Sequence, residues 1–195
     1  MVDFAAAFGV LAYMVLFLTL TVRTARAAGR PVWLFGRGTE HQGLPAFLFR
    51  ISFAGAAIYS FMILLSGSRV ADPLWNMAGG IPADLLGVAL VFAGGAFALY
   101  SQVHMGRSWR IGAAEGELGY IVRTGPFAFS RNPVFVGQVL LFVGMFLVLP
   151  SFIALALVSM LIVAVYLQVC IEERVLDREF GDEYRNYCRK VRRWI

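Results

Sequence analysis

The feature that most constrains the fold of this chain is an apolar block, Val134–Ile171, with no charged residue over 38 positions. A helix of roughly 20 apolar residues crosses the hydrocarbon core of a bilayer, so this block is too long for one crossing. Pro150 interrupts the block, and a proline inside a helical pattern ends or kinks the helix. We therefore predict a tight helical hairpin with spans over Val134–Leu149 and Ser151–Ile171.

Three more apolar stretches are long enough to cross a membrane: Phe4–Val22, Leu44–Ser66 and Leu85–Val103. The first has neither the basic start nor the small-residue cleavage site of a secretory signal, so we expect it to be retained. Hydrophobic residues make up 59% of the chain, whereas they make up roughly 45–50% of the residues in a typical soluble domain. This composition excludes a disordered chain, a disulfide scaffold and most soluble enzymes. We expect an all-α integral membrane protein with five transmembrane helices.

The five spans and their connections form one membrane domain over residues 1–195. Residues 1–103 hold the first three spans, and residues 104–195 hold a long loop, the helical hairpin and a C-terminal helix. Five alternating crossings place 15 of the 17 basic residues on one side of the membrane. Because cytoplasmic segments carry an excess of Lys and Arg, we predict a bacterial inner-membrane protein with its N-terminus outside and its C-terminus in the cytoplasm.

Two basic residues lie apart from this majority, Arg50 and Arg69. Arg50 is close enough to the start of the second span for its side chain to reach the interface. The net charge of +5 reflects the bias toward one side and an attraction to anionic headgroups, so we expect membrane lipids and no nucleic acid as partners.

Polar residues concentrate in two segments, His104–Asn132 and Glu172–Ile195. The first is rich in glycine, and a loop this long in a compact protein is usually functional. The second is predicted to be an amphipathic helix that continues from the fifth span, because apolar residues recur at spacings of three and four. These residues are Leu176, Phe180, Tyr184, Tyr187, Val191 and Trp194.

The start of the fourth span carries a helix-initiation signal. Pro133 suits the first turn of a helix, and Asn132 before it is a candidate N-cap. The simplest interpretation is a capped membrane helix preceded by a turn. The alternative is that Arg131 and Asn132, at the positive end of the helix, bind a carboxylate or phosphate of a ligand.

Two adjacent acids, Glu172 and Glu173, stand where the fifth span ends. Neither has a basic residue three or four positions away, so we expect solvent to satisfy Glu173, whereas Asp177 is expected to pair with Arg174. Glu172 lies nearer the membrane interface, where a ligand with hydroxyl groups or positive charge is the competing explanation.

Other catalytic signals are missing from the sequence. Cys170 and Cys188 form no C-x-x-C pair, and His41 and His104 lie on different loops, so we predict no metal site. The sequence has no Walker loop, no G-x-G-x-x-G and no G-x-S-x-G, which leaves ATPase, Rossmann and hydrolase functions without support.

Together the polar segments resemble the isoprenylcysteine carboxyl methyltransferases and their relatives, the phospholipid methyltransferases. The family pattern is G-x-[YF]…R-[HN]-P-x-[YF]-x-G before a helical hairpin and E-E-x-x-L…F-G-x-x-Y-x-x-Y after it. The matching residues are Gly125, Phe127, Arg131, Asn132, Pro133, Phe135 and Gly137, then Glu172, Glu173, Leu176, Phe180, Gly181, Tyr184 and Tyr187. Bacterial-type members also often carry a sequence like Gly106-Arg107-Ser108-Trp109-Arg110, and the resemblance covers about residues 104–195.

This resemblance implies methyl transfer from S-adenosyl-L-methionine to a lipophilic or membrane-embedded acceptor, in a fold of membrane helices. The cofactor contacts that it implies are Gly119, Tyr120, Ile121, Val122, Phe127, Asn132, Pro133, Val134, Phe135 and Glu172. Gly119 stands where a His often stands, and Asn132 replaces the more familiar His. Gln168 stands where the family has a substrate-side Arg, which disfavours a carboxylate acceptor, and we assign Arg110 and Gln168 to the substrate side.

The acceptor group itself stays open at this point: a thiol, an amine or a carboxylate. Two other functions also remain. The chain could be a non-catalytic membrane scaffold, or an NADPH-dependent reductase, because sterol reductases share this C-terminal architecture.

Overall fold

The computed structural model of the chain describes residues 1–29, 31–37, 40–67, 72–74 and 80–195. Arg30, which belongs to the basic majority, and Arg69, which lies apart from it, are both outside the described residues. Within those ranges the chain is helical, with two isolated β-bridges and no strand. The α-helices are α1 (Val2–Ala28), α2 (Gly43–Ser66), α3 (Gly80–Met105), α4 (Pro133–Val148), α5 (Phe152–Phe180) and α6 (Asp182–Lys190). Two short 3-10 helices, η2 (Gly106–Ser108) and η3 (Gly125–Ala128), lie in the loop between α3 and α4.

Four helices of the described chain are long and apolar enough to cross a membrane: α1, α2, α3 together with η2, and α5. The fourth predicted span corresponds to α4, which has 16 residues and is therefore about 24 Å long. That length falls short of a typical hydrocarbon core of roughly 30 Å. The chain is thus an all-helical membrane protein, while the number of crossings and their direction remain predictions.

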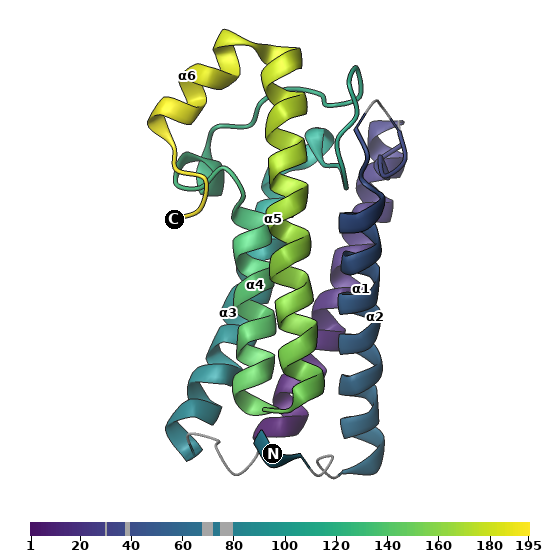
Figure 1. Cartoon of the computed structure of the whole chain (residues 1–195), viewed down its shortest axis with the longest axis vertical. Coiled ribbons are helices and arrows are strands. Elements are labelled where there is room, and N and C mark those ends of the chain that lie inside the picture. Colours follow the sequence, from purple (N-terminus) through teal and green to yellow (C-terminus); the bar gives the residue numbers. More distant parts are fainter. Residues whose placement is uncertain (30, 38–39, 68–71, 75–79) are drawn as a thin grey trace.

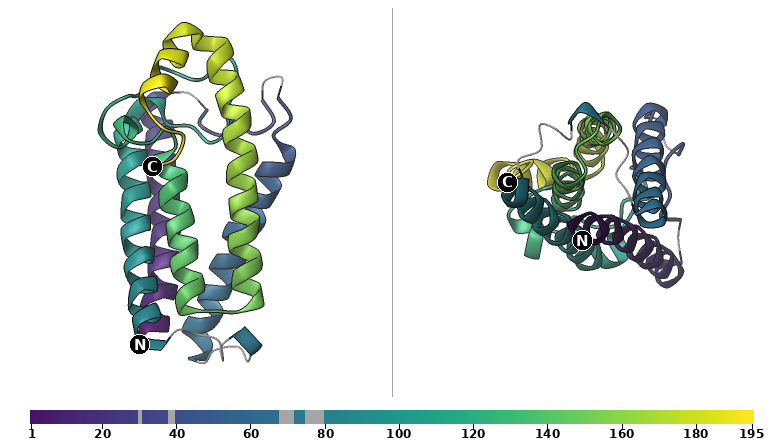
Figure 2. Two further views of the ribbon diagram at one scale, coloured as in Figure 1. Left: turned by 60° about the vertical axis from the view of Figure 1, so that its left-hand side comes forward. Right: turned by 90° about the horizontal axis from the view of Figure 1, so that it is seen from below.

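The apolar helices α1 to α5 run side by side along the long axis of the molecule (Figure 1). The N-terminus and the α4–α5 turn lie at one end. The loop from η2 to η3, the segment before α2 and helix α6 lie at the other (Figures 1 and 2). The polar segments of the sequence therefore gather at one end of the bundle.

The turn between α4 and α5 falls at Pro150, as the sequence predicts. Ser151 is the N-cap of α5, and its Oγ accepts a hydrogen bond from the backbone N–H of Ala154 at 3.1 Å. This bond satisfies one of the donors that the start of a helix leaves unpaired. Helix α5 continues past Ile171 to Phe180, so the two adjacent acids lie within it.

The prediction of a single continuous helix beyond the fifth span is wrong. Helix α5 ends at Phe180, and Gly181 takes a φ of +51°, a region that glycine enters without the steric cost of a Cβ. Helix α6 then turns away from α5 and buries Tyr184 and Tyr187 against the loops (Figure 1). The helical part of the apolar stripe consequently ends before Val191.

Helices α3 and α4 pack backbone to backbone (Figures 1 and 2). A Cβ placed on Gly137 would lie 2.5 Å from the carbonyl oxygen of Gly94, and one on Gly144 would lie 2.5 Å from that of Gly87. Small residues allow this close approach between membrane helices. The contact gives a packing reason for Gly137, the last residue of the motif before the hairpin.

Buried polar contacts hold the loop after α3 against α1. Gln102 Nε2 donates to Thr21 Oγ1 at 2.8 Å, and Trp109 Nε1 donates to the same oxygen at 3.2 Å. Buried polar groups that are hydrogen-bonded in this way fix the position of the segment that carries them. The loop residues just after η2 are therefore held beside the bundle.

Candidate functional site

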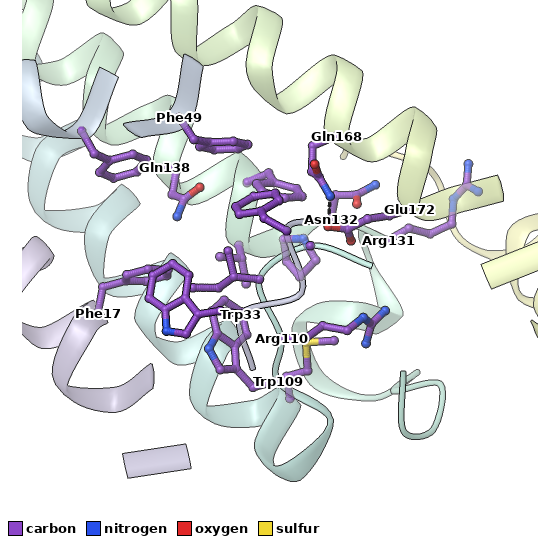
Figure 3. A pocket seen from close by; sticks show the side chains of 18 of the residues that line it. Phe17, Trp33, Phe49, Trp109, Arg110, Arg131, Asn132, Gln138, Gln168 and Glu172 are labelled. Carbon is purple, nitrogen blue, oxygen red and sulfur yellow. Dashed lines mark hydrogen bonds between the residues drawn. The ribbon is translucent and has the colours of Figure 1, made fainter. Parts of the chain in front are cut away.

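A cavity of about 530 Å³ lies where the loops meet the helices (Figure 3). All of the predicted site residues except Gly119 line it. They are Arg110, Tyr120, Ile121, Val122, Phe127, Asn132, Pro133, Val134, Phe135, Gln168 and Glu172. Gly119 is exposed in the loop and has a φ of +77°, so its role is to turn the backbone.

The start of α4 forms one wall of the cavity. Asn132 is the N-cap residue, as predicted, but its side chain makes no capping bond. Instead, Asn132 Nδ2 donates to the carbonyl oxygen of Arg193 at 3.0 Å. The first backbone N–H groups of α4, at Val134 and Phe135, are thus left without a side-chain acceptor from the N-cap, and this positive helix end borders the cavity.

Glu173 is held by arginines rather than by solvent, which corrects the prediction from the sequence. Its Oε1 lies 3.0 Å from Arg131 Nη1, and Arg193 binds both carboxylate oxygens, at 3.1 and 2.5 Å. Only 16% of the Glu173 side chain is exposed. Since Arg131 is engaged by Glu173, it is not a free cation for a ligand. Neither partner is near Glu173 in the sequence, so helical spacing could not reveal them.

The predicted pair within α5 is also wrong. Asp177 Oδ1 accepts from Arg185 Nε of α6 at 2.9 Å, while Arg174 Nη2 lies 3.0 Å from Glu40 Oε2. Arg178 binds Glu40 as well. The charges at the end of α5 therefore connect this helix to α6 and to the segment before α2.

Glu172 lies at the end of a chain of side-chain amides. Gln168 Nε2 donates to Glu172 Oε1 at 3.0 Å (Figure 3). The same nitrogen donates to Gln42 Oε1 at 3.1 Å. Gln42 in turn bonds both backbone groups of Ala113, through Nε2 at 2.6 Å and through Oε1 at 2.9 Å. Gln42 and Gln168 are almost completely buried. This chain fixes the Glu172 carboxylate relative to both α2 and the loop.

Gln42 was not predicted as a site residue. It is the N-cap residue of α2, outside both sequence motifs, and nothing in its sequence surroundings marks it. Its partners come from the loop after α3 and from α5, which only the folded chain brings together. The motif resemblance begins at about residue 104 and therefore could not include it.

Arg110 is buried beside this group. Its Nη1 donates to the carbonyl oxygens of Ser108 at 3.3 Å and Leu118 at 3.1 Å, so it holds the two sides of the loop together. Its positive charge also acts on the Glu172 carboxylate. The structure thus places Arg110 with Glu172 at the polar end of the cavity (Figure 3).

The cavity also has an apolar limb between α1 and α2, which the sequence did not predict. Phe17, Phe49 and Phe53 line this limb, and the ring of Phe49 stacks on Phe135 with centroids 5.7 Å apart. Gln138 also lines it. Its Nε2 donates to Tyr13 Oη at 2.9 Å, while its buried Oε1 accepts no hydrogen bond from the described residues.

Helix α6 and the residues after it cover the polar end. Tyr187 Oη donates to the carbonyl oxygen of Phe127 at 2.7 Å, and the backbone N–H of Arg131 donates to the carbonyl oxygen of Arg192 at 2.9 Å. Tyr184 and Tyr187 both line the cavity. Burial raises the pKa of the Tyr187 hydroxyl, so this group stays protonated and keeps its bond to the loop.

The fold and the cavity define a helical membrane protein with a ligand site at one end of its bundle, polar on one wall and apolar between two helices. Among the described residues, no three His, Cys, Asp or Glu side chains are grouped to hold a metal.

The family model for phospholipid methyltransferases matches residues 83–183, just over half of the chain, and the chain belongs to this family. An uncharacterized protein of Haemophilus influenzae is 44% identical over 41 residues. That alignment spans 21% of this chain and 65% of the length of the relative.

Proposed function

We propose that this protein transfers a methyl group from S-adenosyl-L-methionine to a lipid-type acceptor in the membrane. Its family is one of methyltransferases that act on lipid-type substrates. The observation that carries the proposal is the division of the cavity: Glu172 and the start of α4 form a polar wall, and an apolar limb opens from it between α1 and α2. This division suits one polar and one lipophilic reactant.

The residues of the polar wall fit S-adenosyl-L-methionine. The uncapped N–H groups at the start of α4 suit its carboxylate, because helix N-termini bind anions. The Glu172 carboxylate suits its amine or ribose hydroxyls. Gln168 Oε1 is buried without a hydrogen-bond donor among the described residues, so it provides a further acceptor there. When bound, the cofactor supplies a methyl group activated by an adjacent sulfonium.

The aromatic side chains complete this end of the cavity. Tyr120 and Phe127 line it and can pack against an adenine ring. A cavity of about 530 Å³ lies within the range of roughly 300–1,000 Å³ that is usual for small-molecule sites. Gly119 does not line the cavity, so we propose as cofactor contacts the other nine positions that the family resemblance implies.

We propose roles for Arg110 and Gln168 that differ from the substrate-side roles expected from the sequence. Both act on Glu172, one by its charge and the other by a hydrogen bond, so we place them on the cofactor side of the cavity. The reaction itself needs the nucleophile aligned with the methyl group and water kept away. The apolar limb and the cover formed by α6 meet the second requirement.

Ligand binding to the purified protein tests the proposal. We expect S-adenosylhomocysteine to bind in calorimetry and NADPH not to bind. Binding of NADPH alone would favour the reductase, and binding of neither would favour the scaffold. Transfer of a radiolabelled methyl group from the cofactor into a lipid extract then tests catalysis. Glu172→Gln should abolish most of the binding. Asp182→Asn is the matched control, because 91% of the Asp182 side chain is exposed.

A further inference from the structure

Arg50 is a charged residue in the apolar helix α2, and its side chain lines the cavity. It makes no hydrogen bond or ion pair with any residue in the described ranges. A charge within a membrane helix is costly unless it reaches an interface or meets a partner. Arg50 therefore stands out as a cation that lines the cavity and forms no ion pair with any described residue.

Two matched stripes of side chains place Arg50 at an opening of the cavity. Each stripe follows a spacing of four and then three, so its members share one face of a helix. The stripes are Leu11, Val15 and Leu18 on α1, and Arg50, Ala54 and Ala57 on α2. Val15, Leu18, Arg50 and Ala54 are exposed although they line the cavity, so the cavity opens between α1 and α2.

The side chains at this opening suit a lipid tail. Those of α1 are aliphatic, and Ala54 and Ala57 are too short to close the gap from α2. The opening lies on the flank of two helices that are each apolar enough to cross a membrane. A molecule that enters here arrives from the bilayer rather than from water.

Arg50 lies near the polar end of this limb. It is seven residues into α2, or about 10 Å along the axis from Gly43. Its neighbour Phe49 stacks on Phe135 in the first turn of α4, which sets Arg50 at the level of the polar wall. Because helical side chains tilt toward the helix N-terminus, the Arg50 guanidinium leans toward the end that holds Glu172.

We propose that Arg50 binds the phosphodiester of a bilayer phospholipid whose acyl chains occupy the limb between α1 and α2. This inference rests on the proposed function and names the anchoring group of its acceptor. A guanidinium matches phosphate oxygens with two parallel hydrogen bonds and neutralises their charge. The headgroup beyond the phosphate then extends toward the wall formed by Glu172. Arg50 thus supplies the acceptor-side cation that Gln168 cannot supply.

Calorimetry in neutral maltoside micelles tests this binding with two lipids that have identical tails. Dihexanoylphosphatidylethanolamine carries the phosphodiester, and dihexanoylglycerol lacks it. We expect the wild-type protein to bind the phospholipid about tenfold more tightly. Arg50→Gln should remove this preference, and Arg50→Lys should keep part of it. Arg26→Gln is the matched control, because Arg26 is an exposed arginine of α1 that does not line the cavity.

Two outcomes would overturn the inference. They are equal binding of both lipids by the wild type and a preference for the phospholipid that survives in Arg50→Gln. The binding of S-adenosylhomocysteine is measured on the same samples. If S-adenosylhomocysteine does not bind but the protein still prefers the phospholipid through Arg50, the proposed function is contradicted and the proposed lipid site is supported.

Discussion

Glu173 of α5 pairs with Arg131, the residue before the N-cap of α4, at 3.0 Å. The pair joins the two sequence motifs of this chain, since Arg131 belongs to the motif before the hairpin and Glu173 to the motif after it. It also separates the roles of two adjacent acids. Both acids line the cavity, but the Glu173 carboxylate is bound by Arg131 and Arg193, whereas the Glu172 carboxylate accepts a hydrogen bond from the amide of Gln168.

Glu172→Gln should weaken the binding of S-adenosylhomocysteine by roughly 30- to 150-fold, on the order of 2–3 kcal/mol. The loss follows from removing a carboxylate that accepts charge-assisted hydrogen bonds in a partly desolvated site. Calorimetric titration measures it. Equal affinities for the variant and the wild type would show that the carboxylate does not contact the cofactor.

Glu173→Gln should act mainly on stability and cost less than about 1 kcal/mol of cofactor affinity. Removing this partly buried carboxylate leaves Arg131 and Arg193 without their shared counter-ion, which should destabilise the fold by about 1–3 kcal/mol. Thermal unfolding in detergent gives the stability change. A variant as stable as the wild type would mean that the charges are solvated in solution.

Gln42→Leu should lower the affinity for S-adenosylhomocysteine by about 5- to 10-fold, although Gln42 does not line the cavity. The effect passes through Gln168, which Gln42 orients toward Glu172. A double-mutant cycle with Gln168→Leu separates this effect from general destabilisation. Since residues of one network couple, the two losses should be less than additive. Additive losses would contradict a positioning role.

Gly137→Ala should destabilise the protein by about 1–3 kcal/mol, because the added Cβ meets the backbone of Gly94 and pushes α3 and α4 apart. Gly43→Ala is the matched control. A Cβ at Gly43 meets nothing within 4 Å, so that variant should unfold at the wild-type temperature or slightly above it. Equal melting temperatures for the two variants would rule out the close helix contact.

The contact of Glu40 with α5 should make stability depend on pH. A hydrogen bond from Arg174 and a weaker contribution from the hydrogen bond of Arg178 lower the pKa of the Glu40 carboxyl. A group with a lowered pKa stabilises the fold above its ordinary pKa, and this stabilisation is lost as the pH falls through the lowered value. The wild type should therefore melt above Glu40→Gln at pH 7, and the difference should shrink toward pH 3. A difference that stays constant with pH would exclude this cause.

The sequence alone determined the helical membrane architecture and much of the polar end of the cavity, but not the apolar limb. The apolar block with Pro150 predicts the turn between α4 and α5, because a span has a minimum length and proline ends a helix. The motif residues around Asn132 and Glu172 lie together because the hairpin between them returns the chain to the same end of the bundle. These features depend on local pattern and on the distance that a helix spans.

The tertiary structure alone decided which polar groups meet. Glu173 finds Arg131 and Arg193, and Gln168 finds Gln42, because helix packing brings together segments that are far apart in the chain. The opening beside Arg50 likewise forms only where the lining faces of α1 and α2 lie next to each other. A hydrogen bond or ion pair acts over a few ångströms, so its partners depend on which segments pack against each other. The spacing of residues along one helix does not contain this information.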